Sequence, residues 1–204
     1  MMVGREMTGS KGRLVLAALL MLTATSGAVA RDMAGMGTAS PAIVPSPMAC
    51  PATPAALPGE LSGWNRRVPL TAALEAGARP GAEARLTPGT AVDGTLGPTP
   101  EVRYALRPEK PGGSVSFGGI YAFTVPEAGH YRVALGSAAW IDVIEAGDAG
   151  KGNAKGLTSI AHGHGPECSG IRKMVDFALE PGDYLLQIAA NAEAKLPLLV
   201  TRLP

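Results

Sequence analysis

The chain has 204 residues, enough for one domain with extensions or at most two small domains. Its 18 basic and 17 acidic side chains nearly balance, so the basic surplus typical of nucleic-acid binders is missing. Apolar residues make up 46% of the chain, which suffices for an ordinary core, while 27 glycines and 18 prolines divide it into short segments. Such a composition disfavours long helices and favours short strands joined by turns.

The first 30 residues have the order of a secretory signal peptide. A positively charged start precedes the apolar run 14–22, and a small-x-small site predicts cleavage after Ala30. The apolar run is shorter than the roughly 20 residues that cross a bilayer, so no membrane span is expected. We therefore expect a periplasmic or secreted protein. The basic residues of the start are Arg5, Lys11 and Arg13.

A leader is predicted between the signal peptide and the folded domain. Residues 31–60 are rich in Ala, Pro, Met and Gly, which predicts an extended or disordered segment that is ordered only where Cys50 ties it down. The domain is expected over residues 61–204, with its core at about residues 100–203. The Ala-rich stretch 70–84 favours one short helix before that core.

From about residue 85 the pattern is typical of strands. Apolar residues alternate with polar or small ones in short runs that end at Pro or Gly, at roughly ten-residue spacing. This spacing predicts an all-β fold, an antiparallel, jelly-roll-like β-sandwich of seven or eight short strands. The clearest runs are 102–107, 119–125, 130–135, 140–145, 173–179, 183–189 and 196–203.

Two of the predicted hairpins echo each other. Residues 123–135 and 177–188 each begin with an aromatic-x-aliphatic strand end, turn at Gly, and open the next strand with Tyr131 or Tyr184. Gly suits the turn, and the Tyr hydroxyl can bond back across it. The unit resembles the β-sandwich of the bacterial pre-peptidase C-terminal type over residues 115–203. That resemblance implies a non-catalytic accessory or binding module.

The chain has two cysteines, Cys50 and Cys168. In an oxidising compartment a lone pair usually forms a disulfide, and closing so long a loop removes about 4 to 5 kcal/mol of unfolded-chain freedom in the entropic model. We expect this bond to join the leader to the loop around Cys168. A thiolate metal ligand and a nucleophile are the alternatives.

The segment 161–170 concentrates groups that can carry chemistry. Imidazoles two residues apart on a strand point to one side, and they are common ligands of iron, copper and zinc. Two histidines and a carboxylate with open positions form the ligand set of non-haem iron oxygenases. The alternative is a Gly/Pro-rich loop fixed by the disulfide, with histidines solvated or bonded to loop carbonyls. The candidate metal ligands are His162, His164 and Glu167.

This segment resembles half of the first cupin motif. Gly156, His162 and His164 fit its spacing, whereas Glu167 comes early and no histidine follows residue 164. His130, at a turn position, is the one other imidazole. The stretch 162–177 is similar to one in small secreted bacterial proteins described as homogentisate 1,2-dioxygenases. That resemblance implies a metal-dependent dioxygenase holding one iron, copper or zinc ion.

We favour a secreted, non-catalytic β-sandwich that needs no cofactor and binds a small molecule, a glycan or an envelope protein. No nucleic-acid partner is expected. Trp140 and Tyr121 are candidates for a stacking platform, although aromatic residues at strand positions more often belong to the core. The alternative is the metal-dependent dioxygenase built on His162, His164 and Glu167.

Overall fold

The computed structural model describes residues 50, 56–76, 82–148 and 154–204. The predicted signal peptide, its cleavage site and most of the predicted leader lie outside these residues. Within the described ranges, no helix combines the length and the apolar character needed to cross a membrane.

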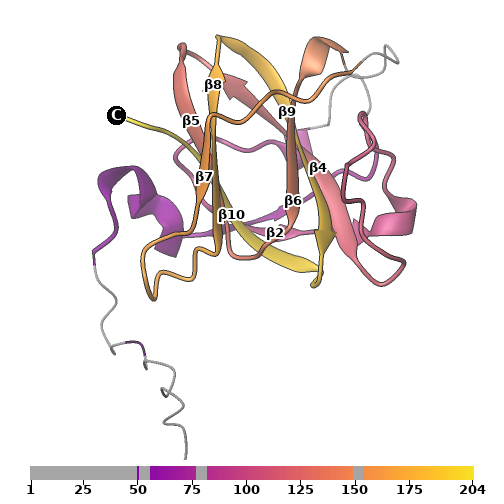
Figure 1. The fold of residues 1–204 in the computed structure, drawn as a ribbon, viewed down its shortest axis with the longest axis horizontal. Helices are drawn as coiled ribbons and strands as arrows, with labels where there is room; N and C mark the ends of the chain where they lie inside the picture. The colour runs from indigo at the N-terminus through magenta and orange to yellow at the C-terminus, as the bar shows by residue number, and fades with distance from the viewer. Residues whose placement is uncertain (1–49, 51–55, 77–81, 149–153) are drawn as a thin grey trace, which may run out of the picture. The chain divides into compact units, whose positions relative to one another are not determined.

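Two β-sheets pack face to face, which confirms the predicted all-β sandwich (Figure 1). All strand pairs are antiparallel except β1 with β2. In sheet order, the six-stranded sheet consists of β1 (Val68–Thr71), β2 (Val92–Thr95), β10 (Lys195–Arg202), β5 (Gly129–Leu135), β8 (Lys173–Leu179) and β7 (Ala161–Gly163). The four-stranded sheet consists of β3 (Gly97–Pro98), β4 (Phe117–Val125), β9 (Gly182–Asn191) and β6 (Trp140–Glu145).

The main core lies between the two sheets. Its largest members alternate along the strands, as expected for two apolar sheet faces that meet. Phe123 of β4 stacks on Tyr184 of β9, with ring centroids 5.5 Å apart. Both tyrosines of the echoed hairpins bond back as predicted: Tyr131 donates to the Glu127 carbonyl (3.0 Å) and Tyr184 to the Glu180 carbonyl (2.9 Å).

The prediction of a strand at residues 102–107 is wrong. This segment, which follows the 3₁₀ helix η3 (Thr99–Glu101), packs across the outer face of the four-stranded sheet. The fully buried Gln187 of β9 holds it there, because its Oε1 accepts from the Ala105 and Leu106 amides at 2.6 and 3.1 Å. Its Nε2 donates to the Leu106 carbonyl at 2.9 Å. The alternation of apolar and polar residues in this segment therefore arises because it covers the outer face of the four-stranded sheet.

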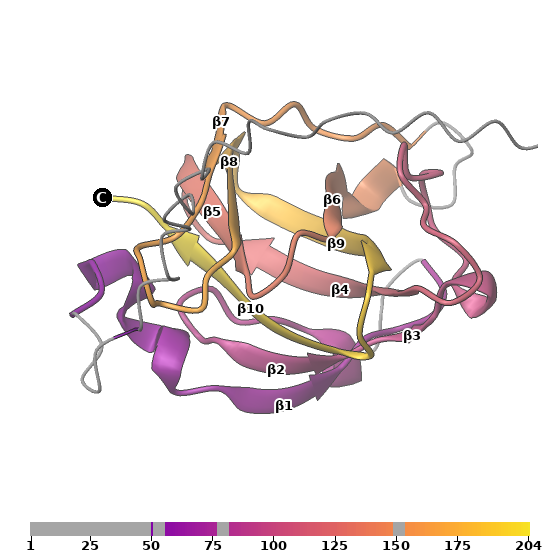
Figure 2. The ribbon, with the colours of Figure 1, turned by 60° about the horizontal axis from the view of Figure 1, so that its bottom comes forward.

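The outer face of the six-stranded sheet is covered by the 3₁₀ helix η1 (Gly59–Asn65). Leu61 and Trp64 of η1 pack with Ala134, Ile171 and Leu199 into a second apolar cluster. Gly59 and Glu60, at the end of the predicted leader, open this helix. η1 lies at the lower left of Figure 2.

The helix predicted within residues 70–84 is also wrong over its described part. Val68–Thr71 form β1, and Ala73 and Glu75 make isolated bridges to Ile120 and Arg103. Only the three-residue 3₁₀ helix η2 (Ala82–Ala84) is helical among the described residues there. Backbone pairing with neighbouring segments outweighs the helix propensity of the alanines.

Candidate ligand-binding groove

The histidine-rich segment forms a short edge strand followed by a loop. His162 lies in β7, opposite Val175 of β8. β7 ends at Gly163, so the period-two rule no longer governs His164, whose Nδ1 donates to the Arg172 carbonyl at 2.8 Å. The carbonyl can only accept, which places the proton on Nδ1. The side chain of Glu167 is exposed.

The structure does not bring the three predicted metal ligands together. Among the described residues, no group of three or more His, Cys, Asp or Glu side chains is arranged to hold a metal ion. His164 is bonded to the carbonyl of a loop residue, as expected for the alternative of a Gly/Pro-rich loop fixed by the disulfide. His130 is exposed on β5, opposite Ala178, and forms no cluster with them.

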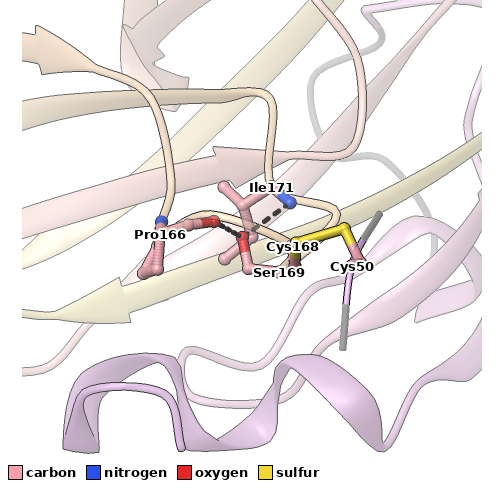
Figure 3. Close-up of a disulfide and its surroundings, with 5 residues drawn as sticks. All are labelled: Cys50, Pro166, Cys168, Ser169 and Ile171. Carbon is pink, nitrogen blue, oxygen red and sulfur yellow. Dashed lines mark hydrogen bonds between the residues drawn. A yellow bond between two sulfur atoms is a disulfide. The ribbon is translucent and has the colours of Figure 1, made fainter. Parts of the chain in front are cut away.

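The predicted disulfide between Cys50 and Cys168 is present, with Cα atoms 5.5 Å apart (Figure 3). Cys168 adopts a positive φ of 58°. Hydrogen bonds between residues of the same loop stabilise its conformation. The Ser169 hydroxyl donates to the Pro166 carbonyl (2.6 Å) and accepts from the Ile171 amide (3.1 Å). Both sulfur atoms are used by this bond, which leaves neither as a thiolate.

A hollow of about 540 Å³ opens beside His162. Its lining includes residues of β6 and β7, the last strands of their sheets. Residues 154–160 cross between the two sheets: the Leu157 amide donates to the Val143 carbonyl (2.8 Å) and the Ile160 amide to the Asp176 carbonyl (2.8 Å). Figure 2 shows the segment running to β7. We call this hollow the Trp140 groove; it is lined by Lys110, Trp140, Ile141, Asp142, Leu157, Ser159, His162, Lys173, Val175 and Phe177.

Trp140, the first residue of β6, is a partly exposed indole in this groove. Its Nε1 donates to both carboxylate oxygens of Asp142, each at 3.0 Å, which fixes the ring. Two ammonium groups lie over the ring: Lys110 at 5.6 Å and Lys173 at 5.7 Å from its centroid. Lys173 also donates to the Ala139 carbonyl at 2.7 Å.

The charges of the groove are partly desolvated. Burial raises the pKa of the Asp142 carboxyl, and the Trp140 N–H opposes that shift. Burial also lowers the pKa of the Lys173 ammonium, which the nearby charge of Lys110 lowers further. Desolvated charges interact more strongly than fully hydrated ones, so these groups can orient a ligand.

The structure separates the two aromatic residues that were candidates for a stacking platform, Trp140 and Tyr121. Tyr121 is fully buried in the core and takes no part, whereas Trp140 lies in the groove. Lys110, Asp142 and Lys173, which surround the Trp140 ring, were not predicted as site residues. Asp142 could have been found, because Trp-x-Asp on a strand places both side chains on one face. The two lysines are far apart in the chain and carry no local signal.

Comparisons with known proteins assign no family to the chain: no protein-family model matches it, and no curated protein does either. An indole fixed by a carboxylate and flanked by two cations can bind and orient a flat ligand.

Proposed function

We propose that the protein is an exported, non-catalytic binding protein whose ligand occupies the Trp140 groove. One observation carries the proposal: a partly exposed indole, its N–H held by Asp142, lies in a hollow of about 540 Å³. Pockets for small ligands are commonly about 300–1,000 Å³ and combine apolar walls with a few placed polar groups. Ile141, Leu157 and Val175 supply such walls here.

The groups of the groove are suited to binding. The indole offers a flat apolar face at little entropic cost, because its orientation is already set by Asp142. Asp142 is engaged by that N–H, and Lys173 by the Ala139 carbonyl. A rigid aromatic surface surrounded by polar groups is typical of ligand and sugar sites. The resemblance of the hairpins to accessory modules agrees with this role.

Export is proposed on two independent grounds. The first 30 residues have the charge, apolar run and small-residue site of a secretory signal. The disulfide between Cys50 and Cys168 is of a kind that persists in oxidising compartments such as the periplasm. Expression of the full chain in a bacterial host, followed by mass spectrometry of the periplasmic fraction, should find a mature N-terminus at Arg31.

The binding proposal is tested with aromatic and saccharide fragments screened by ligand-observed NMR. Fragments that bind the native protein should lose at least tenfold in affinity with Trp140→Ala. Ile160→Ala is the matched control, because Ile160 is exposed on the same crossing segment and does not line the groove. Equal binding by Trp140→Ala, or an absence of any binding fragment, would refute the groove as the site.

Metal content tests the alternative of a metal-dependent dioxygenase. The protein is purified from the periplasm under oxidising conditions, and its iron, copper and zinc are measured. We expect substoichiometric metal and no oxygen uptake with homogentisate. Stoichiometric metal that disappears in a His162→Ala, His164→Ala double variant would overturn the non-catalytic assignment.

A further inference from the structure

Two cations that are distant in the sequence meet at one indole. Lys110 comes from the connection between η3 and β4, and Lys173 is the first residue of β8. Their ammonium groups lie 5.6 and 5.7 Å from the centroid of the Trp140 ring. The two positive charges repel each other, while the charge of the Asp142 carboxylate attracts Lys173.

The single charge of Asp142, which acts on Lys173, offsets only part of the double positive charge of this pair. Among the described residues, neither Lys110 nor Lys173 is in an ion pair. Asp142 directs both carboxylate oxygens to the Trp140 N–H. Glu109 acts on Asp142 by its charge but is exposed and does not line the groove. Each ammonium has three donors, of which Lys173 uses one on Ala139.

The remaining walls suit a ring. Leu157, Val175 and Phe177 line the same groove with apolar side chains, Val175 and Phe177 from the edge of the core, and His162 adds a further polar group. Lys110 is exposed and its side chain is long and flexible, so its ammonium can leave the ring face and turn to a bound group. The lysines thus supply a site for negative charge next to a site for a flat apolar body.

We infer that the ligand of the Trp140 groove is a small ring-bearing anion, of which an aromatic carboxylate is the simplest example. Its ring packs against Trp140 and its anionic group lies between Lys110 and Lys173. This inference rests on the proposed function and names the chemical class of the ligand. Binding includes charge-assisted hydrogen bonds from the ammoniums, which are stronger than bonds between neutral groups.

The test compares phenylacetate with its neutral counterpart phenylacetamide on the purified protein by isothermal titration calorimetry. We expect phenylacetate to bind at least tenfold more tightly, and its affinity to fall as salt is raised. Lys110→Met with Lys173→Met should remove that preference. The matched control is Lys155→Met, since Lys155 is exposed on the crossing segment and does not line the groove.

A second measurement needs no ligand affinity. With Trp64→Phe, Trp140 is the one indole left in the chain, and its fluorescence can be quenched by iodide and by neutral acrylamide. The two lysines should concentrate iodide at the ring, so the lysine double variant should lower the iodide-to-acrylamide quenching ratio about twofold. The ratio is valid only for variants whose circular dichroism matches the parent, and native protein gives the same comparison if Trp64→Phe misfolds.

The outcomes separate the two claims. Equal affinity for the acid and the amide, with both lost in Trp140→Ala, would overturn the anionic class and leave the groove as a binding site. Unchanged preference in the lysine double variant would also overturn it. Failure of both probes to bind would refute the inference, whereas the fragment screen with Trp140→Ala decides the proposed function.

Discussion

Trp64 and Trp140 make the same kinds of contact in different surroundings. Trp64 donates its N–H to the Ser169 carbonyl (2.9 Å) and has the Arg67 guanidinium 5.7 Å from its ring centroid. Trp140 likewise has a satisfied N–H and cations over its ring. The difference is exposure: Trp64 is 2% exposed, whereas Trp140 opens into a groove.

The two indoles differ in the group that accepts the hydrogen bond from their N–H. Trp64 is anchored to the backbone of the disulfide loop, so it links η1 to that loop and covers the outer face of the six-stranded sheet. Trp140 is anchored to a carboxylate two residues ahead in its own strand, which fixes the ring without covering it. A fully covered indole with a backbone acceptor stabilises the fold, and a partly exposed one with polar neighbours is available to a ligand.

The largest expected effect comes from truncating the two indoles in turn. Trp64→Ala should lower the free energy of unfolding by about 3–5 kcal/mol, because it leaves a cavity among apolar side chains. Trp140→Ala should cost about 1 kcal/mol or less, since its ring is partly exposed. Urea unfolding followed by circular dichroism measures both. Similar losses in the free energy of unfolding for the two variants would contradict the distinction between a structural Trp64 and an accessible Trp140.

A smaller effect is expected from removing the disulfide. Replacing Cys50 and Cys168 by Ser should lower stability by about 2–5 kcal/mol under oxidising conditions. The structural change should be confined to the surroundings of Trp64, because the Ser169 carbonyl that accepts its N–H directly follows Cys168. Acrylamide should therefore quench Trp64 more strongly, while the quenching of Trp140 stays as in the native protein. Variants with single tryptophans separate the two signals. Free thiols detected in the denatured, unreduced native protein would contradict the bond itself.

Local patterns were enough to predict much of the sandwich. The strands β6 and β8 begin and end where their alternation and flanking residues predicted, and both echoed tyrosines bond across their turns. The segment 102–107 was wrongly predicted as a strand, because apolar and polar residues also alternate in a chain segment that crosses the outer face of a sheet. Its position depends on Gln187, more than 80 residues away in the chain, which no local pattern indicates.

The candidate site was harder to predict than the fold. His162, His164 and Glu167 drew attention because they are close in sequence, yet the end of β7 at Gly163 separates their directions. Lys110 and Lys173 meet at Trp140 only through the packing of β6, β8 and the connection before β4. Convergence of distant residues is a tertiary property, so only the Trp140 and Asp142 pair could be inferred in advance.

The smallest expected effect concerns the carboxylate that fixes Trp140. Burial raises the pKa of Asp142 in the folded protein, so its contribution favours folding at acid pH and is lost as pH rises through the folded pKa. At neutral pH, Asp142→Asn removes a partly desolvated charge while the amide oxygen still accepts the indole N–H. We therefore expect a gain of a few tenths of a kcal/mol at pH 7, small because the group is partly exposed.

The pH dependence of that gain distinguishes desolvation from simple repacking. Near pH 3 the native carboxyl is largely protonated, so the advantage of Asp142→Asn should vanish there. Melting temperatures of both proteins between pH 3 and pH 7 check this, with Glu101→Gln, at an exposed carboxylate outside the groove, as the control. A pH-independent gain would attribute the effect to packing. A loss of stability at neutral pH would mean that the charge of Asp142 holds Trp140 and the lysines in place. The hydrogen bond of Trp140 would then contribute to folding, as the hydrogen bond of Trp64 does.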